Sequence, residues 1–333
     1  MVERRTARVC VDVMGGDHAP DKILEGVDDA LAVDPDLVVV LTGDVGIVGP
    51  FASSRDRVEA HPTTEVIAMD EHPANSVRAK KDSSVVVGCR LVRDGEADAF
   101  FSAGSTGACM AAATLVMGRI RGVSRPAIAT VIPTGGTPTV LLDVGANADC
   151  KAENLLQFAH MGSAYATTVL GLESPRVGLL NIGEEATKGS LLAQEAHALM
   201  AESVGGFAGN IEGRDVTTGV VDVIVTDGFT GNIALKLLEG LSRTLLGEVK
   251  AAMTSGVLNS LAAAVLKPSL QALRDELDPD TYGGAPLLGV NGICIIGHGS
   301  SGARAVASAI RVAAQAARGG LTERIAGAIT GPS

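Results

Sequence analysis

The chain has 333 residues, a net charge of −11 and 46% hydrophobic residues, which is enough apolar material for a large buried core. Aromatic residues make up only 2% of the chain and tryptophan is absent, so a basic surface with stacking aromatics for nucleic acid is not expected. No apolar run reaches the roughly 18 residues of a membrane-spanning helix. The N-terminal segment lacks the apolar core of a signal peptide, and the five cysteines occur singly. These features favour a cytoplasmic protein with reduced thiols.

Short runs rich in Val, Ile and Leu alternate with helical segments along the chain. In chain order, we predict strands over residues 8–14, 37–42, 65–69, 97–102, 127–132, 139–144, 176–182, 221–226 and 292–296. The clearest helices are predicted over residues 21–33, 83–94, 106–119, 152–170, 190–204, 233–252 and 302–317. Apolar strands separated by helices are typical of a mainly parallel sheet covered on both faces. We therefore expect an α/β fold, a three-layer α/β/α sandwich, as a single domain over residues 1–333.

One helical segment, 237–277, differs from the rest. Lys250 and Lys267 flank its apolar run, and Pro268 interrupts it. Two interpretations stay open. The segment is a helix pair packed on the sheet or at a dimer interface, or it is a projecting helical hairpin. In the second case Leu258 and Leu261 at the tip would touch a membrane surface, because an apolar face flanked by lysines suits the lipid interface.

The first predicted strand ends in a glycine loop. Residues 11–20 run from a β-branched strand into Gly15 and Gly16, followed by Asp17 and His18. Glycine allows a ligand to approach the backbone closely, and α/β proteins bind ligands at the carboxyl ends of strands. A tight turn with Asp17 as a helix cap and an exposed His18 explains the same residues.

A second loop, 102–108, follows a predicted strand and opens a predicted helix. Its small residues leave backbone N–H groups free to face an anion, and Ser102, Ser105 and Thr106 add hydroxyl groups beside Gly107. These features indicate a phosphate site, although an ordinary Ser/Thr helix cap has the same appearance. The loop is neither a Walker A loop nor a dinucleotide-binding fingerprint.

Four further strand-end loops carry polar residues that suit one composite site. They contribute Asn147, Lys188, Asp227 with Asn232, and His298 with Ser300. A lysine at the mouth of a sheet can neutralise phosphate or a developing oxyanion, although most lysines are simply solvated. Asp227 suits a helix cap or a proton acceptor, and Asn232 can donate to a carbonyl oxygen. The histidines lack carboxylate neighbours at ligand spacing, so no metal site is expected.

Taken together, these loops resemble the PlsX family, the phosphate acyltransferases of bacterial phospholipid synthesis. The matching stretches are 11–20, 102–108, 141–147, 183–189, 227–232, 282–292 and 297–301, in the family's order. The family usually has Asn where this chain has Ser105, which is a shorter hydrogen-bonding side chain. The resemblance implies transfer of a long fatty acyl group from acyl carrier protein to inorganic phosphate. The acyl phosphate would feed a membrane-bound glycerol-3-phosphate acyltransferase, and no cofactor is expected.

The resemblance also implies a fold similar to phosphotransacetylases and to isocitrate and isopropylmalate dehydrogenases, and a homodimer. On this basis Ser102, Ser105, Thr106 and Gly107 are expected to hold phosphate. Lys188 and Asn232 would face the thioester oxygen, and His18 or Asp227 would manage protons near the leaving thiol. The expected substrate-binding residues also include Gly15, Gly16, Asp17, Asn147, His298 and Ser300.

An acidic carrier protein requires a local basic patch on this acidic chain. Two are available: Arg119, Arg121 and Arg125 after the phosphate helix, and Arg243, Lys250, Lys267 and Arg274 on the helical segment. Two alternatives to the acyl carrier protein reaction are an enzyme similar to phosphotransacetylase that uses acyl-CoA, and a non-catalytic membrane scaffold. A metal- and NAD-dependent dehydrogenase fits the fold class but lacks a cluster of aspartates.

Overall fold

The computed structural model describes residues 6–134, 136–276 and 279–331, without the side chains of 257–258, 260–262, 272–276 and 279–280. Its strands are β1 (Ala7–Asp12), β2 (Leu37–Gly43), β3 (Val58–Pro62), β4 (Ala99–Ser102), β5 (Ala127–Ile132), β6 (Thr139–Leu142), β7 (Val177–Leu180), β8 (Phe207–Ile211), β9 (Val223–Val225), β10 (Ala285–Leu288) and β11 (Ile293–Ile296). Its helices are α1 (Asp21–Val33), α2 (Val45–Ser53), α3 (Pro73–Ala79), α4 (Ser84–Arg93), α5 (Thr106–Ala112), α6 (Ala152–Val169), α7 (Leu191–Ser203), α8 (Gly228–Met253), α9 (Val257–Glu276), α10 (Ala303–Arg318) and α11 (Leu321–Thr330). A π-helical turn, Ala113–Met117, extends α5, and short 3₁₀ turns cover Gly213–Asp215 and Pro279–Tyr282.

The described strands form one 11-stranded sheet with the order β3-β2-β1-β4-β11-β10-β5-β6-β9-β7-β8. The pairings are parallel except for β11 with β10, β10 with β5, and β5 with β6. Three reversals between β11 and β6 mean that β6, β9, β7 and β8 run opposite to β1, β2, β3, β4 and β11. The predicted mainly parallel sheet is confirmed, but its two halves have opposite strand directions.

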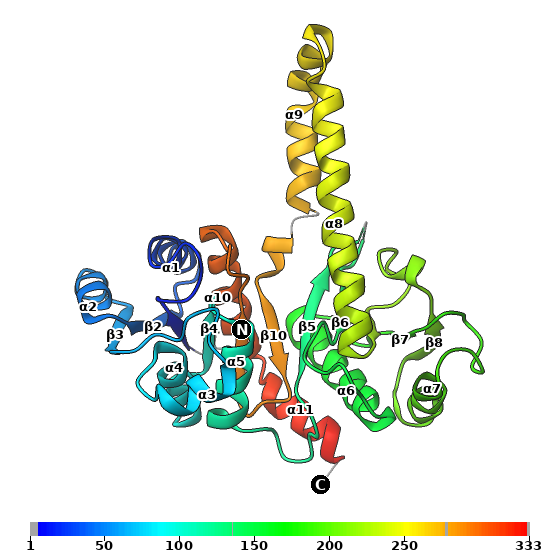
Figure 1. Cartoon of the computed structure of the whole chain (residues 1–333), viewed down its shortest axis with the longest axis horizontal. Helices are drawn as coiled ribbons and strands as arrows, with labels where there is room; N and C mark the ends of the chain where they lie inside the picture. The colour runs from blue at the N-terminus through cyan, green and yellow to red at the C-terminus, as the bar shows by residue number, and fades with distance from the viewer. Residues whose placement is uncertain (1–5, 135, 277–278, 332–333) are drawn as a thin grey trace.

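Two apolar clusters cover the two faces of this sheet. Alternate residues of β1 belong to different clusters: Val9 and Val11 to one, Cys10 to the other. The first cluster includes residues of α1, α6, α7, α10 and α11, and the second includes residues of α3, α4, α5 and the early part of α8. Helices therefore cover both faces, as Figure 1 shows, and the predicted three-layer sandwich is confirmed.

One predicted strand, 65–69, is wrong. Glu65 makes only an isolated bridge to Ser83, and Val66 and Met69 are exposed at the surface. Its apolar residues, 66–69, form a short continuous run without a neighbouring strand to pair with, so the pattern alone is misleading. The edge strands β3 and β8 escape prediction because both contain polar or glycine residues where buried strands have Val or Ile.

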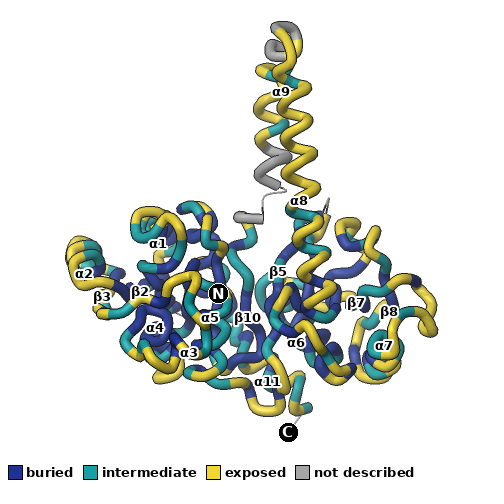
Figure 2. The backbone as a smooth tube through the Cα atoms, in the orientation of Figure 1, coloured by how far each residue is buried: buried dark blue, intermediate teal, exposed yellow. Residues whose placement is uncertain are grey.

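The helices α8 and α9 form a hairpin that projects away from the sandwich (Figure 1). The described part of this hairpin is almost entirely exposed, as Figure 2 shows. The interpretation of 237–277 as a helix pair packed on the sheet is therefore wrong, and α8 begins earlier than predicted, at Gly228. The side chains of Leu258 and Leu261 lie outside the described part. Among the helices that the structure describes, none is both long and apolar enough to cross a membrane.

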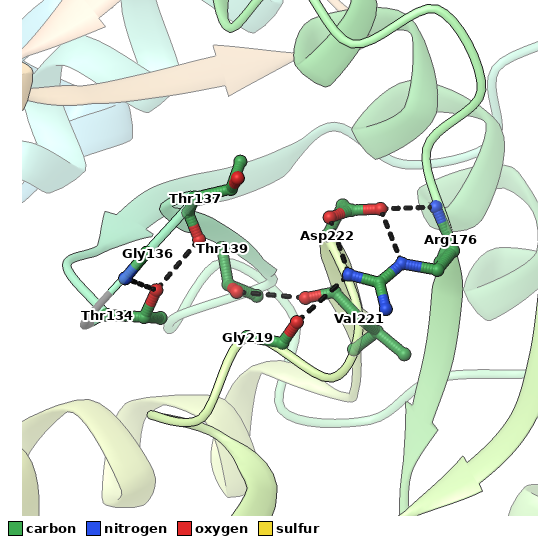
Figure 3. Close-up of polar contacts among 8 residues, drawn as sticks. All are labelled: Thr134, Gly136, Thr137, Thr139, Arg176, Gly219, Val221 and Asp222. Carbon is green, nitrogen blue, oxygen red and sulfur yellow. Dashed lines mark hydrogen bonds and ion pairs between the residues drawn. The ribbon is translucent and has the colours of Figure 1, made fainter.

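Polar contacts fix the second half of the sheet beside the hairpin (Figure 3). Arg176 donates to both carboxylate oxygens of Asp222, and its guanidinium also donates to the carbonyl oxygen of Gly219. The buried hydroxyl of Thr139 donates to the carbonyl oxygen of Val221 at 2.9 Å. These bonds join the starts of β6, β7 and β9, at the end of the sheet opposite to their carboxyl-terminal loops.

Candidate functional site

The carboxyl ends of β1 and β4 are joined by a buried polar contact. Asp12, the last residue of β1, is 1% exposed, and its Oδ2 accepts a hydrogen bond from Ser102 Oγ at 2.7 Å. Ser102 Oγ in turn accepts the main-chain N–H of Gly104 at 3.0 Å. A Cβ atom at Gly15 would lie 2.6 Å from Asp12 Oδ2 and 2.7 Å from the nitrogen of Gly104. Only glycine fits here, so the two loops pack backbone against backbone.

Burial raises the pKa of the Asp12 carboxyl, and hydrogen bonds from Ser102 and from the main chain of Met14 oppose that rise. The nearby hydroxyl of Ser84 also favours the ionised form, although it makes no hydrogen bond of standard geometry. The groups in contact with Asp12 are therefore donors that suit a carboxylate.

The residues at the carboxyl ends of β1 and β4 form a first group of candidate site residues, and the loop after β11 completes it. The main-chain N–H of Asp17 donates to the carbonyl oxygen of Gly299 at 2.7 Å. His298 Nδ1 lies 2.7 Å from Ser300 Oγ and 3.2 Å from the nitrogen of Ser300. The side chains of Asp17, His18, His298 and Ser300 are exposed, so they are accessible to a ligand.

The predicted phosphate residues open α5. Ser105 caps this helix, with its Oγ accepting the main-chain N–H of Ala108 at 3.4 Å. Thr106 is exposed, while Ser105 and Gly107 are half-buried. A Cβ at Gly107 would come within 2.6 Å of Pro73, so the start of α3 packs directly over this loop. Ser102, by contrast, is 0% exposed beneath the loop.

The second group forms at the carboxyl ends of β6 and β9. Asp143 is 0% exposed and has a φ of 28°, a backbone conformation that non-glycine residues rarely adopt. Its carboxylate accepts the main-chain N–H groups of Ala146 and Asn147 and the side-chain amide of Asn147. Burial raises the pKa of Asp143, and the hydrogen bonds from Asn147 and Ala146 oppose that rise. Such a backbone conformation persists where surrounding contacts determine it, as they do here.

The start of α8 is locked onto this turn. The N–H of Gly228 donates to the carbonyl oxygen of Asn147 at 2.8 Å. A Cβ at Gly231 would lie 2.1 Å from the carbonyl oxygen of Asp143, so glycine is required for the helix to approach. Asp227 acts as the helix cap, because its two carboxylate oxygens accept the N–H and the hydroxyl of Thr230. Both interpretations of Asp227 had been open; the capping geometry is the one observed.

Asn232 and Lys188 are exposed polar residues of the second group. Asn232 lies over Gly145, 3.7 Å from where a Cβ would stand. The loop that carries Lys188 follows β7 and is held by Asn181, which donates to the carbonyl oxygen of Lys188 at 3.0 Å. The ammonium of Lys188 forms no ion pair with any described acidic residue, so it is available to an anionic ligand.

The two groups do not touch. No hydrogen bond or ion pair joins them within the described ranges, and their strands run in opposite directions. Both groups nevertheless lie on the same face of the sheet, the face that α5 and the start of α8 cover. Because side chains alternate between the two faces along a strand, Asp12 shares the face of Cys10, and Ser102 shares the face of Phe100. In Figure 1, α5 and the lower end of α8 stand on either side of β10.

A basic loop lies beside the second group. The amide Nδ2 of Asn147 donates to the carbonyl oxygen of Pro126 at 2.7 Å, which ties the Asp143 turn to the preceding arginine-rich loop. Arg119 donates to the carbonyl oxygen of Ser124, and Arg125 donates to that of Asp149. Their guanidinium groups are exposed and have no acidic side-chain partner in the described part of the chain.

A comparison with protein families identifies the chain. A model of the family described as "fatty acid synthesis protein" matches residues 7–324. The chain belongs to this family. Proteins named phosphate acyltransferase from Desulfitobacterium hafniense (strain DSM 10664 / DCB-2) and Heliobacterium modesticaldum are both 50% identical to it. The first alignment covers 322 residues and 96% of each protein; the second covers 313 residues, 92% of this chain and 93% of the relative. The predicted PlsX family is confirmed, and the chain is an acyltransferase enzyme.

Solved structures agree on the fold. A phosphotransacetylase from Streptococcus pyogenes superposes with a TM-score of 0.60 at 17% identity, covering 93% of this chain and 94% of that one. A branched-chain phosphotransacylase from Enterococcus faecalis V583 gives a TM-score of 0.59 at 14% identity, covering 93% and 99%. At these identities the likeness establishes the fold, as the sequence predicted.

Sequence reasoning passed over Asp12 as a site residue and placed Ser102 among the phosphate ligands. The available signal for Asp12 was an acidic residue that ends a strand directly after the apolar run Val9–Val11. Within the described residues, no three His, Cys, Asp or Glu side chains are arranged to hold a metal ion.

Proposed function

We propose that the chain transfers a long-chain fatty acyl group from acyl carrier protein to inorganic phosphate, forming acyl phosphate for phospholipid synthesis. Family membership supports the transfer to phosphate. The observation that carries the choice of donor is the basic loop with Arg119, Arg121 and Arg125, which has no acidic side-chain partner among the described residues and is attached to the candidate site through Asn147. On a chain of net charge −11, such a loop gives an acidic partner a local docking surface.

The reaction needs no covalent enzyme intermediate. Phosphate at neutral pH is already an anionic nucleophile, and one of its oxygens attacks the thioester carbonyl carbon. The carbon–sulfur bond then breaks, and the thiolate leaves and takes up a proton. An enzyme accelerates such a step by holding the two reactants together and stabilising the oxyanion.

The exposed residues of the two groups fit these tasks. In our proposal Ser105, Thr106 and Gly107 hold the phosphate at the first group. Lys188 and Asn232 at the second group face the thioester oxygen, since both are exposed and Lys188 has no ion-pair partner among the described residues. The two groups would act on one substrate pair between α5 and α8, because both belong to the same face of the sheet.

In this proposal His18 is the residue that transfers protons at the leaving thiol. Both carboxylate oxygens of Asp227 already accept hydrogen bonds from Thr230, which leaves Asp227 poorly placed to accept a proton. His18 is exposed beside the Gly15–Gly16 turn, and imidazole is the side chain that enzymes use most often as a general acid or base.

We also propose that the hairpin contacts a membrane surface through Leu258 and Leu261 and contributes to a homodimer. The support is the apolar surface that the hairpin exposes. Leu237, Leu241, Leu245 and Leu246 are each more than half exposed, and Val265 is 80% exposed. Contiguous exposed apolar residues of this kind mark interaction surfaces. A membrane-bound glycerol-3-phosphate acyltransferase would then receive the acyl phosphate close to where it is made.

Purified protein incubated with long-chain acyl carrier protein tests the reaction directly. We expect free carrier-protein thiol and acyl phosphate, trapped as a hydroxamate, to appear only when inorganic phosphate is added. The same assay with acyl-CoA separates the alternatives. Phosphate-dependent turnover of acyl-CoA but not of acyl carrier protein would overturn the proposed donor, and turnover of neither would overturn the proposed reaction.

A further inference from the structure

We infer that Asp12 is a positioning residue: its carboxylate holds Ser102, and through Ser102 fixes the 103–107 loop in the conformation that binds phosphate. This inference rests on the proposed function, because it concerns the loop assigned to phosphate. It assigns Ser102 to the shape of the loop and leaves the phosphate contacts to Ser105, Thr106 and Gly107.

The single proton of the Ser102 hydroxyl is used within the protein. A serine hydroxyl has one proton, and that of Ser102 is donated to Asp12 Oδ2 at 2.7 Å. Its oxygen accepts the N–H of Gly104 at 3.0 Å, and the residue is 0% exposed. Ser102 therefore has no proton to donate to a phosphate oxygen and no surface through which to reach one.

The Asp12 carboxylate serves two loops at once. Its Oδ1 accepts the main-chain N–H of Met14 at 3.0 Å, which shapes the turn that leads to Gly15. Its Oδ2 holds Ser102 and so the Gly104 turn. Because β1 lies between β2 and β4 in the sheet, the carboxylate is anchored on a rigid element. One side chain thus sets the position of the first glycine loop relative to the phosphate loop.

The chemistry of the Asp12–Ser102 pair indicates that it positions the loops and does not merely fill the core. A buried carboxylate without an ion pair is costly, and an apolar pair of the same shape can replace a buried polar pair with little loss of stability. Asp12 forms no ion pair in the described part of the chain, and the donors hydrogen-bonded to it, Met14 N–H and the Ser102 hydroxyl, belong to the loops after β1 and β4. Such an arrangement orders loop backbone in a way that an apolar pair cannot.

The variants Asp12→Asn, Ser102→Ala and the double variant test this inference in the full-length protein. We expect each single variant to raise the KM for phosphate about 10-fold while changing kcat and the KM for the acyl donor less than about 2-fold. Because both changes weaken or remove the same hydrogen bond between Asp12 and Ser102, the double variant should be no worse than the worse single variant. Independent, multiplying effects on the KM for phosphate would overturn the inference.

A matched control is available in the other half of the sheet. Thr139 is also 1% exposed and donates a buried hydrogen bond, to Val221 at 2.9 Å (Figure 3). Thr139→Val should lower thermal stability without changing the KM for phosphate. If Thr139→Val raised that KM as much as Ser102→Ala, or if Ser102→Ala left it unchanged, Asp12 and Ser102 would be merely structural.

A second measurement separates this inference from the proposed function. Inorganic phosphate that binds the folded protein raises its melting temperature. We expect phosphate to raise the melting temperature of the wild type but not that of Ser102→Ala. Ser102→Ala is used here because it replaces the hydroxyl with a small apolar group, so it is better able to fold than Asp12→Asn. An active wild type with an equal phosphate-induced shift in Ser102→Ala would refute the positioning role alone. A wild type without phosphate-dependent turnover would refute the proposed reaction, and the melting shifts would still test the loop.

Discussion

Asn147 joins two parts of the candidate site through one amide group: its Nδ2 donates to Asp143 Oδ2 at 2.8 Å and to the carbonyl oxygen of Pro126 at 2.7 Å. The first bond holds the turn on which α8 begins, and the second holds the end of the basic loop. The amide therefore has no hydrogen left for a substrate, and any direct contact must involve its oxygen. Because Asn147 is 8% exposed, both bonds form away from water.

Asn147→Asp tests this junction. In the wild type the Asn147 amide donates to two acceptors, Asp143 Oδ2 and the Pro126 carbonyl oxygen. The change replaces this donor with a carboxylate oxygen, which cannot donate to either acceptor. We expect a loss on the order of 3 kcal/mol in the free energy of unfolding, because the buried acceptors lose their donors and a like charge is added. Urea unfolding measures the loss. The same change at exposed Asn232 should leave stability within about 0.5 kcal/mol of wild type; equal losses at both positions would contradict a special role for Asn147.

Lys188→Ala tests the proposed oxyanion contact. Removing one donor to an oxyanion typically costs about 100-fold in rate, so kcat/KM for acyl-phosphate formation should fall by about that factor. Lys22→Ala, which removes an exposed lysine paired with Glu25 on α1, is the control and should retain wild-type activity. Activity of Lys188→Ala within a few-fold of wild type would remove Lys188 from the mechanism.

Charge reversal distinguishes the two basic patches. Arg121→Glu combined with Arg125→Glu should raise the KM for acyl carrier protein about 10-fold and weaken its salt dependence, because exposed charges steer association. Arg243→Glu combined with Lys250→Glu on the hairpin should leave both unchanged. The opposite pattern would move the docking surface to the hairpin.

Glu71 lies just before α3, the helix whose first residue packs over Gly107, and its pKa is lowered. Hydrogen bonds from Lys80, from the main chain of Ala68 and from Ser76 lower the pKa of Glu71 to about 2. A lowered pKa in the folded state means that the stabilisation is present above the unfolded value of about 4.3 and is lost as the pH falls toward 2. The stability difference between wild type and Glu71→Gln should therefore be largest near neutral pH and shrink below about pH 4.

Urea unfolding of both proteins over a pH series measures that difference. Glu173→Gln, at an exposed position outside this cluster, is the control and should show no such trend. A difference for Glu71→Gln that stayed constant from neutral pH to about pH 3 would contradict the assignment of the shifted carboxyl to Glu71.

Leu258→Glu combined with Leu261→Glu tests the hairpin tip. If the tip inserts between lipid headgroups, added charge should release the protein from phospholipid vesicles in a flotation assay, because burying carboxylates in lipid is costly. Val33→Glu, at an exposed apolar position on α1, is the control and should remain bound to the same extent as wild type. Retention of the double variant on vesicles would indicate that another surface makes the contact.

The sequence alone was sufficient for the α/β class and the family. Strands such as 37–42 are apolar at nearly every position, which only a sheet covered on both faces explains, and the glycine loops occur in a fixed order. The edge strands β3 and β8 could not be predicted in the same way, because they are partly solvated and need no continuous apolar run.

The tertiary structure decided which polar residues are available for chemistry. Ser102 and Thr106 look alike in sequence, but Ser102 is buried against Asp12 while Thr106 is exposed. The reversal of strand direction between β11 and β6, and the projection of α8 away from the sheet, also depend on pairings between segments far apart in the chain. Local sequence patterns predict whether a residue is buried and which secondary structure it adopts. The hydrogen-bond partner of a hydroxyl or carboxylate depends on contacts between segments far apart in the chain, so these patterns do not predict it.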